Sequence, residues 1–264
     1  MNIHHICTMI QLQIENRIAT LILDRPEKRN ALDDLMAGAL LKHLEDLKDN
    51  PECKVLLIKA NGEAFCAGAD LEYLQKLQNN TFDENLADSR ALMSMFRALY
   101  HFPKLTIAQV EGAALAGGSG LAGLCDFCFA TPESKFGYTE VKIGFIPAIV
   151  SVFLGPKIGE NLAKKMLLTG DIFMAEEALK MNLITEIIDG SVIQDYVMNF
   201  ASRLVTSVSE ESVKLTKNLL NNIKGKSLDE QLEIAARANA EARGTEDCKK
   251  GIRSFLNKEK ITWA

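Results

Sequence analysis

The stretch at residues 105–131, LTIAQVEGAALAGGSGLAGLCDFCFAT, decides the fold class of this 264-residue chain. Its apolar start at 105–110 predicts a buried strand, and the small residues that follow predict a tight turn. A short helix is expected at 121–124 and a second strand at 127–130. Strand, turn, helix and strand in so few residues are typical of an α/β layer fold.

The residues before this stretch continue the same alternation. Residues 10–24 alternate apolar and polar side chains around Glu15 and Asn16, which predicts a β-hairpin. Apolar residues at helical spacing, with acidic residues near the start, predict a helix at 31–47. Further elements are expected as a strand at 54–59, a helix beginning at Asp70 and a helix at 87–100.

The residues after it divide into two parts. The first part predicts a short strand at 135–137, helices at 158–168 and 175–181, and a strand at 183–188. From about residue 196 the pattern is mostly helical and offers no strand partner. We therefore expect a core at residues 1–195 and a helical packing or oligomerisation region at residues 196–264.

Composition excludes several function classes. The net charge is 30 − 35 = −5 without a basic run, which argues against nucleic-acid binding. No apolar stretch reaches the ~18–20 residues that span a bilayer, so no membrane partner is expected. The N-terminus lacks a basic segment followed by an apolar one, so no secretion signal is expected. The six cysteines are then expected to be reduced thiols of a cytoplasmic protein.

Three segments resemble known site motifs, but each lacks a feature that the motif requires. Residues 118–123 match G-x-G-x-x-G, but Asp126 follows too soon for the long helix of a dinucleotide site. Ser119 lacks the last glycine of G-x-S-x-G, because Leu121 stands there. The C-x-x-C at 125–128 has no second pair at zinc spacing, which favours buried thiols and no metal.

Two segments of small residues remain, and they resemble each other. FCAGADL at 65–71 and AALAGG at 113–118 each lie between an expected strand and an expected helix. Free backbone N–H groups at helix starts that face one point would form an oxyanion hole, which stabilises negative charge on a carbonyl oxygen. The alternative is that both segments are only tight turns.

The sequence resembles the enoyl-CoA hydratase/isomerase (crotonase) superfamily from about residue 10 to residue 263. The resemblance rests on LDRPEKRNAL (23–32), AFCAGADL (64–71), VEGAALAGGSGLAGLCDFCFAT (110–131), KFGYTEVKIGFIP (135–147) and GIRSFLNKEK (251–260). It implies a crotonase-like spiral of ββα units with a helical C-terminal trimerisation region. It also implies a homotrimer or a dimer of trimers, and an acyl-CoA substrate whose coenzyme A is part of the substrate rather than a separate cofactor.

The resemblance also assigns the catalytic groups. The oxyanion hole falls to the backbone amides of Ala69 and Gly117. Hydratases of the family carry two glutamates; Gly120 stands at the first position, and Glu140 at the second. A lone glutamate is found in the family's isomerases and in dehydratases that act on a hydroxymethylglutaryl group. Without the resemblance, Glu140 would be taken for a surface carboxylate.

Neighbouring residues refine this expectation. Glu140 is expected in an apolar pocket, with Phe136, Phe145 and Ile146 near it in sequence, and burial there would raise its pKa. After them, Ala-Ile-Val-Ser at 148–151 replaces the Gly-rich stretch of the usual hydratase. This replacement resembles methylglutaconyl-CoA hydratases and branched-chain dehydratases.

Contacts with coenzyme A are implied by position. Lys28 is expected at a phosphate, and Phe255 and Lys258 are expected to reach coenzyme A from a neighbouring subunit. Both lysines are alternatively ordinary solvated side chains. The residues expected along the rest of the bound substrate are Ala67, Asp70, Leu71 and Gly118.

The expected function is reversible hydration or dehydration of an enoyl-CoA, including a branched, methylglutaconyl-like one. Three alternatives stay open. They are movement of a double bond by a single-base Δ3,Δ2-enoyl-CoA isomerase, a decarboxylase that uses the oxyanion hole alone, and a catalytically silent CoA-binding protein.

Overall fold

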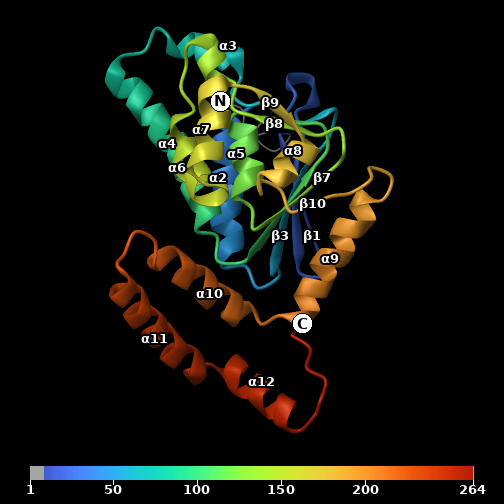
Figure 1. Ribbon diagram of the computed structural model, residues 1–264. Helices are drawn as coiled ribbons and strands as arrows, with labels where there is room; N and C mark the ends of the chain where they lie inside the picture. The colour runs from blue at the N-terminus through green and yellow to red at the C-terminus, as the bar shows by residue number, and fades with distance from the viewer. Residues whose placement is uncertain (1–8, 264) are drawn as a thin grey trace.

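The computed structural model describes residues 9–263 of the chain, and two sheets form its centre (Figure 1). The larger sheet has the strand order β1 (Ile10–Glu15), β2 (Ile18–Leu23), β3 (Val55–Ala60), β5 (Leu105–Val110), β7 (Phe127–Ala130) and β10 (Glu186–Ile187). The expected hairpin is confirmed: β1 and β2 pair antiparallel, and Asn16 and Arg17 turn between them at φ of 50° and 63°. The other pairs of this sheet are parallel.

The smaller sheet consists of very short strands. Its order is β4 (Ala64–Cys66), β6 (Ala113–Leu115), β8 (Lys135–Gly137) and β9 (Ile172–Met174). The first three strands are parallel, and each one follows a strand of the larger sheet along the chain. A long strand, a short strand and a helix therefore repeat, which is the expected spiral of ββα units. Of these four strands, only β8 is expected from the sequence. Strands β4, β6 and β9 are missed, because three residues are too few to show alternation.

Two long helices cover one face of this arrangement. Helix α2 (Asp34–Lys48) begins at Asp33, whose carboxylate accepts a hydrogen bond from the Met36 amide at 2.8 Å. Helix α4 (Phe82–Tyr100) starts with a capping box of Thr81 and Glu84, five residues before the expected start. The two helices pack against each other along the core.

The expected helix at 158–168 is wrong in part. The structure has two helices here, α6 (Ala148–Ile158) and α7 (Glu160–Thr169), which meet at Gly159 with φ of 86°. Helix α6 was not expected, because its residues AIVSVFLGPKI are mostly apolar without a helical period and include Pro156. The short helix α8 (Ala175–Lys180) follows β9 and matches the expected helix at 175–181.

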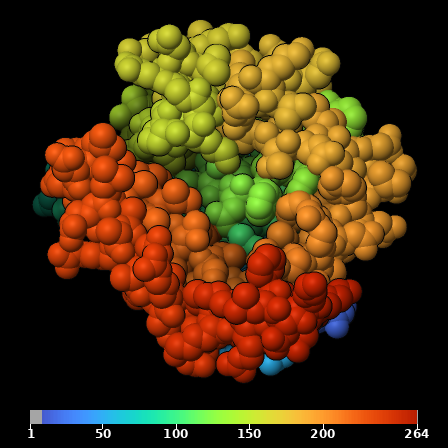
Figure 2. Space-filling view, turned by 60° about the horizontal axis from the view of Figure 1, so that its bottom comes forward, coloured from blue at the N-terminus to red at the C-terminus, as the bar shows by residue number. Residues whose placement is uncertain are grey.

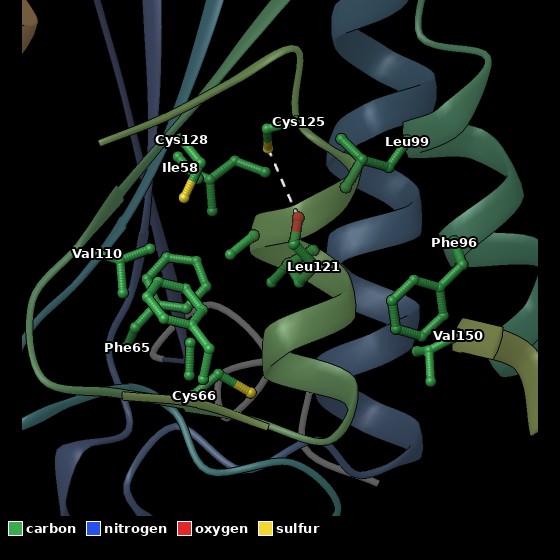
Figure 3. Packing of buried hydrophobic residues seen from close by; sticks show 14 of the residues in the cluster. Ile58, Phe65, Cys66, Phe96, Leu99, Val110, Leu121, Cys125, Cys128 and Val150 are labelled. Atoms are coloured by element: carbon green, nitrogen blue, oxygen red, sulfur yellow. Dashed lines mark hydrogen bonds between the residues drawn. The ribbon is translucent and has the colours of Figure 1, made fainter. Parts of the chain in front are cut away.

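Helix α9 (Ile193–Ser207) closes the other face of the larger sheet. Its buried residues Val197 and Ala201 belong to one apolar cluster with Val55, Leu57 and Phe129 of the sheet. The main core lies on the opposite face, around α5 (Gly117–Leu124), as Figure 3 shows. Helix α9 runs across the expected boundary between residues 195 and 196. The division into a core and a C-terminal oligomerisation region stays a prediction.

The last three helices stand apart from the core. None of α10 (Glu210–Asn222), α11 (Leu228–Gly244) and α12 (Glu246–Leu256) contains a buried residue. Figure 2 shows a hollow between them and the rest of the protein. Salt bridges anchor α10 to the core, from Lys217 to Asp126 and from Arg17 to Glu210, each at 2.6 Å. Among residues 9–263, no helix is both long and apolar enough to span a bilayer.

Candidate active site

Three parallel strands of the smaller sheet end at one edge of the fold. Strand β6 pairs with β4 on one side and with β8 on the other, with Ala114 opposite both Cys66 and Phe136. Carboxyl ends of adjacent parallel strands lie side by side, and ligands of α/β proteins commonly bind there. The segments that leave these ends carry Ala69, Gly117 and Glu140.

The amide of Ala69 is free at this edge. Leu32 forms an isolated parallel bridge beside it: the Leu32 amide donates to the Gly68 carbonyl at 2.7 Å, and the Asp70 amide donates to the Leu32 carbonyl at 2.8 Å. Backbone groups alternate in direction along an extended segment. The Ala69 N–H therefore points away from Leu32, and it has no backbone acceptor among the described residues.

The amide of Gly117 is free for a different reason. Gly117 is the first residue of α5, and the first turn of a helix has no internal acceptors for its N–H groups. The preceding Ala116 has φ of 50° and ψ of −121°, an unusual conformation for alanine. Its amide donates to the Gly137 carbonyl of β8 at 2.7 Å, which fixes the entry into the helix.

Glycines allow the two loops to touch. A Cβ added to Gly68, which has φ of 96°, would lie 2.6 Å from the Ala116 Cβ. A Cβ added to Gly118 would lie 2.2 Å from the Cys66 carbonyl oxygen. The two free N–H groups therefore belong to segments in direct contact, and a donor pair of this kind can stabilise an anionic oxygen. The same contacts bury Gly118 and pack its backbone on β4, and its expected contact with the substrate stays a prediction.

Glu140 starts the 3₁₀-helix η2 (Glu140–Ile143), shortly after β8. One carboxylate oxygen, Oε2, is buried and has no hydrogen-bond partner among the described residues. Burial raises the pKa of Glu140 above its usual value, which a bond to its own amide only partly opposes. A half-buried carboxyl with a raised pKa and an uncommitted oxygen suits proton transfer.

The aromatic and apolar residues expected around Glu140 differ in their exposure. Phe136 is buried, as expected. Phe145 and Ile146 are 51% and 64% exposed within one chain, and their expected place beside the Glu140 carboxyl stays a prediction. The turn at Gly144, with φ of 76°, carries the chain into an exposed segment before α6. Tyr138, two residues before Glu140, is also buried; burial raises its pKa most strongly, and the charge of Glu140 raises it further.

The space beside Gly120 is closed. A Cβ on Gly120 would lie 2.4 Å from Val150 Cγ1 and 3.2 Å from Phe96 Cε1. Figure 3 shows Phe96 and Val150 close to each other. Val150 therefore fills the space that a side chain at position 120 would need. The absence of the first glutamate and the unusual residues at 148–151 belong to the same packing contact.

The expected coenzyme A residues lie in several environments. Lys28 is at the surface, and its Nζ lies 2.6 Å from Glu72 Oε1, so its ammonium group already has an acidic partner. Ala67 and Leu71 flank the Ala69 segment; Ala67 is half-buried and Leu71 is 69% exposed. Both are accessible to a ligand at this edge.

Asp70 has a structural role in this chain. Its carboxylate begins α3 (Leu71–Leu77) by accepting the amides of Glu72 at 2.9 Å and Tyr73 at 3.3 Å, and it pairs with Arg25 at 3.0 Å. Burial raises the pKa of Asp70, but the two amides and Arg25 outweigh this and hold it below its ordinary value. Its carboxylate is fully engaged within the protein.

Phe255 and Lys258 lie at the end of α12, and Figure 1 shows α12 at the opposite end of the molecule from α3 and β8. Phe255 is 83% exposed. Within one chain these two residues do not join the Ala69, Gly117 and Glu140 site. Their expected contact with coenzyme A from a neighbouring subunit stays a prediction.

The C-x-x-C consists of buried core thiols, as expected. Cys125 Sγ lies 3.6 Å from the Leu121 carbonyl oxygen that it faces, and burial raises the pKa of Cys128 to about 12 (Figure 3). Within residues 9–263, no group of three or more metal-ligating side chains gathers.

Comparisons with known proteins agree with this geometry. A family model described as enoyl-CoA hydratase/isomerase matches residues 13–264. A Thermus thermophilus protein with the provisional name enoyl-CoA hydratase is 40% identical over 95% of this chain and 98% of its own. The crotonyl-CoA hydratase of Syntrophomonas wolfei is 31% identical over 96% of this chain and 97% of its own. The crystal structure of an enoyl-CoA hydratase from Shewanella pealeana superposes with a TM-score of 0.91 at 33% identity, covering 97% of this chain and 96% of that one. The chain has the crotonase fold and belongs to the enoyl-CoA hydratase/isomerase family.

Proposed function

We propose that the protein catalyses the reversible hydration of an enoyl-CoA, and the dehydration of the corresponding 3-hydroxyacyl-CoA, with Glu140 as the sole acid and base. The observation that carries this proposal is the buried, unpartnered Oε2 of Glu140 at the same strand edge as the free amides of Ala69 and Gly117. The hydratase names of the relatives support the same reaction class.

The dehydration can be followed atom by atom. The Glu140 carboxylate removes a proton from the carbon next to the thioester, and the electron pair moves onto the thioester oxygen. The amides of Ala69 and Gly117 stabilise that negative charge; removing one such donor typically costs about 3–4 kcal/mol. The carbonyl then reforms, the carbon–carbon double bond forms and the bond from the β carbon to the hydroxyl breaks. The Glu140 proton passes to the departing hydroxyl as water.

One carboxyl is sufficient when proton and hydroxyl leave from the same face of the substrate. Hydration is the reverse sequence, in which Glu140 deprotonates water and then protonates the α carbon. No electrons enter or leave the substrate, so the reaction requires no redox cofactor, and coenzyme A is part of the substrate. A branched, methylglutaconyl-like acyl group is our proposal for the substrate, because residues 148–151 resemble that group of enzymes.

Isomerisation is the second candidate. Val150 and Phe96 make the wall beside Gly120 apolar, which favours a reaction that needs one carboxyl and no bound water. A Δ3,Δ2-enoyl-CoA isomerase would return the proton to the γ carbon instead of adding water. Turnover in heavy water distinguishes the two: water addition gives a hydroxyacyl product, and isomerisation gives α or γ deuterium without it.

We also propose that three or six copies assemble through α10–α12, whose exposed apolar side chains include Leu220, Leu232 and Ile252. Burial of such side chains is the usual driving force for association. Light scattering of the purified protein tests this. A monomer at working concentration would contradict it.

The test of the main proposal is Glu140→Gln, which keeps the shape and removes the acid. We expect turnover of crotonyl-, 3-enoyl- and methylglutaconyl-CoA to fall at least about a hundredfold, the lower end of what a general base contributes. Binding of an acyl-CoA should survive. Glu133→Gln is the matched control, because Glu133 is exposed and only seven positions earlier. Near-normal turnover of the Glu140→Gln variant would remove Glu140 from the mechanism. Wild-type protein that binds CoA but turns over no thioester would favour the silent binding protein.

A further inference from the structure

One residue, Leu32, contacts both segments that carry the oxyanion donors, the amides of Ala69 and Gly117. Its backbone forms the isolated bridge beside Ala69, in which its amide donates to the Gly68 carbonyl at 2.7 Å and its carbonyl accepts from the Asp70 amide at 2.8 Å. Its side chain reaches the other segment, because a Cβ added to Gly117 would lie 3.0 Å from Leu32 Cδ1. Leu32 therefore borders both donors.

A second buried side chain, Phe96 of α4, also packs against Gly117. Phe96 Cζ would lie 3.8 Å from a Cβ on Gly117, so the contact from Leu32 is the tighter of the two. Phe96 is completely buried, and Leu32 is 5% exposed. Protein interiors are close-packed, so buried side chains at these distances leave the Gly117 backbone little room to shift. Of the two side chains, that of Leu32 belongs to the residue that also bonds the Ala69 segment.

The segment that carries Leu32 is itself fixed beside the sheets. Asn30, two residues earlier, is completely buried. Its Nδ2 donates to the carbonyls of Asn61 at 2.9 Å and Ala64 at 2.8 Å. Its Oδ1 accepts a hydrogen bond from the Arg25 amide at 2.8 Å. Breaking any of these bonds would leave a buried polar group unpaired, so the segment has one favoured geometry from which Leu32 can hold the donors.

We propose that Leu32 is a positioning residue of the oxyanion hole and sets the distance between the amides of Ala69 and Gly117. It holds the Ala69 segment by backbone hydrogen bonds, which other residues at position 32 could also form. It holds Gly117 by the bulk of its side chain. Shortening that side chain leaves the bridge in place and releases Gly117 alone, because neighbouring groups move partly into the space that a deleted buried group leaves. The two N–H groups then no longer point to one position.

This inference rests on the proposed function where it is measured through turnover. A pair of donors stabilises the developing charge only when both point to the position of the oxygen, and a misplacement of about 1 Å can lower a rate about a hundredfold. Leu32 transfers no proton and donates no hydrogen bond to the substrate. Its loss should therefore lower kcat and leave KM for the acyl-CoA nearly unchanged.

The experiment compares Leu32→Ala with Leu40→Ala. Leu40 is also completely buried in the main core, and none of its atoms lies within 4 Å of a Cβ built on Gly117. We expect Leu32→Ala to lower kcat about tenfold with KM within about twofold. Leu40→Ala should lose stability but keep kcat within about twofold. Leu32→Met, which fills the space again, should restore kcat to within about threefold of the wild type.

A second readout does not depend on turnover. It is the carbonyl stretch of bound butyryl-CoA labelled with ¹³C at the thioester carbon, measured by infrared difference spectroscopy; this saturated ligand cannot be hydrated. We expect the stretch to shift less on binding to Leu32→Ala than on binding to the wild type or to Leu40→Ala. If Leu32→Ala does not fold, Leu32→Val and Leu40→Val make the same comparison, because valine lacks the δ carbon that reaches Gly117.

Equal effects of Leu32→Ala and Leu40→Ala on kcat, a rise in KM alone, or a wild-type carbonyl shift in Leu32→Ala would each overturn the positioning role. Failure of the proposed function gives a different result. The wild-type protein would then turn over no acyl-CoA, while the carbonyl shift of bound butyryl-CoA and its dependence on Leu32 could still be measured.

Discussion

The contact between Gly120 and Val150 makes a quantitative prediction about packing. The change is Gly120→Ala, which places a methyl group 2.4 Å from Val150 Cγ1, where ordinary contacts are 3.4–4 Å. The overlap of about 1 Å or more must be relieved by moving α5 or α6. Overpacking of this kind costs about 1–3 kcal/mol, against a gain of about 0.5–1 kcal/mol from replacing a helical glycine.

The expected net loss for Gly120→Ala is therefore about 0–2.5 kcal/mol of unfolding free energy. Val150→Ala alone should cost about 1.5–3 kcal/mol, because it deletes two buried methyl groups and leaves a cavity. Together they should cost less than the sum by about 1 kcal/mol or more, since the small side chain at 150 makes room for the new methyl. Urea denaturation of the four proteins measures this coupling.

Gly123→Ala is the control in the same helix. Its added Cβ would lie 3.4 Å from Leu183 Cδ1, an ordinary contact, so this variant should be as stable as the wild type or slightly more stable. Equal stabilities for the variants at 120 and 123, or strictly additive losses at 120 and 150, would refute the account of the closed space beside Gly120.

Three further predictions concern the same edge of the fold. Burial raises the pKa of Glu140 in the folded protein above its unfolded value, so the folded protein binds the proton more tightly and loses stability as the pH rises from the unfolded pKa through the folded one. Glu140→Gln should therefore raise Tm more at pH 8 than at pH 4. An equal change in Tm at both pH values would contradict the burial of this carboxyl. Gly68→Ala should lower kcat at least about tenfold, because φ of 96° and a Cβ 2.6 Å from the Ala116 Cβ force the Ala69 amide to move. An unchanged kcat would mean that the Ala69 amide takes no part in the reaction. Arg25→Met removes the cation that pairs with both Asp33 at 2.7 Å and Asp70 at 3.0 Å, and should cost about 3–5 kcal/mol by thermal or urea unfolding. A loss below about 1 kcal/mol would mean that these pairs behave as solvated surface pairs.

Sequence periodicity predicts the long strands and most helices, because their apolar residues repeat over enough positions to reveal the period. It misses β4, β6 and β9, each of three residues, although two of them carry the oxyanion loops. The start of α5 is also missed, because glycines at 117 and 118 are poor helix formers and their surroundings come from distant parts of the chain: Gly118 lies against Cys66, and Gly117 against Leu32 and Phe96.

In the site, too, features marked by local sequence are predicted, and features that depend on distant contacts are missed. The small residues around Ala69 and Gly117 mark free amides locally, so both segments are found from sequence. The engagement of Asp70 with Arg25, 45 positions away, is invisible to any local pattern. The link between Gly120 and Val150 likewise arises only when α5 and α6 pack, and the exposure of Phe145 follows from the path of the chain after Gly144.

The central claim is that two backbone N–H groups, of Ala69 and Gly117, hold one thioester oxygen. Infrared difference spectroscopy of an unreactive acyl-CoA with a ¹³C-labelled thioester carbonyl measures this directly, using the Glu140→Gln protein to prevent turnover. The account predicts that the carbonyl stretch moves to lower frequency on binding and that Gly68→Ala abolishes most of the shift. A bound ligand whose carbonyl frequency equals that in water, or a shift that Gly68→Ala leaves intact, would contradict it.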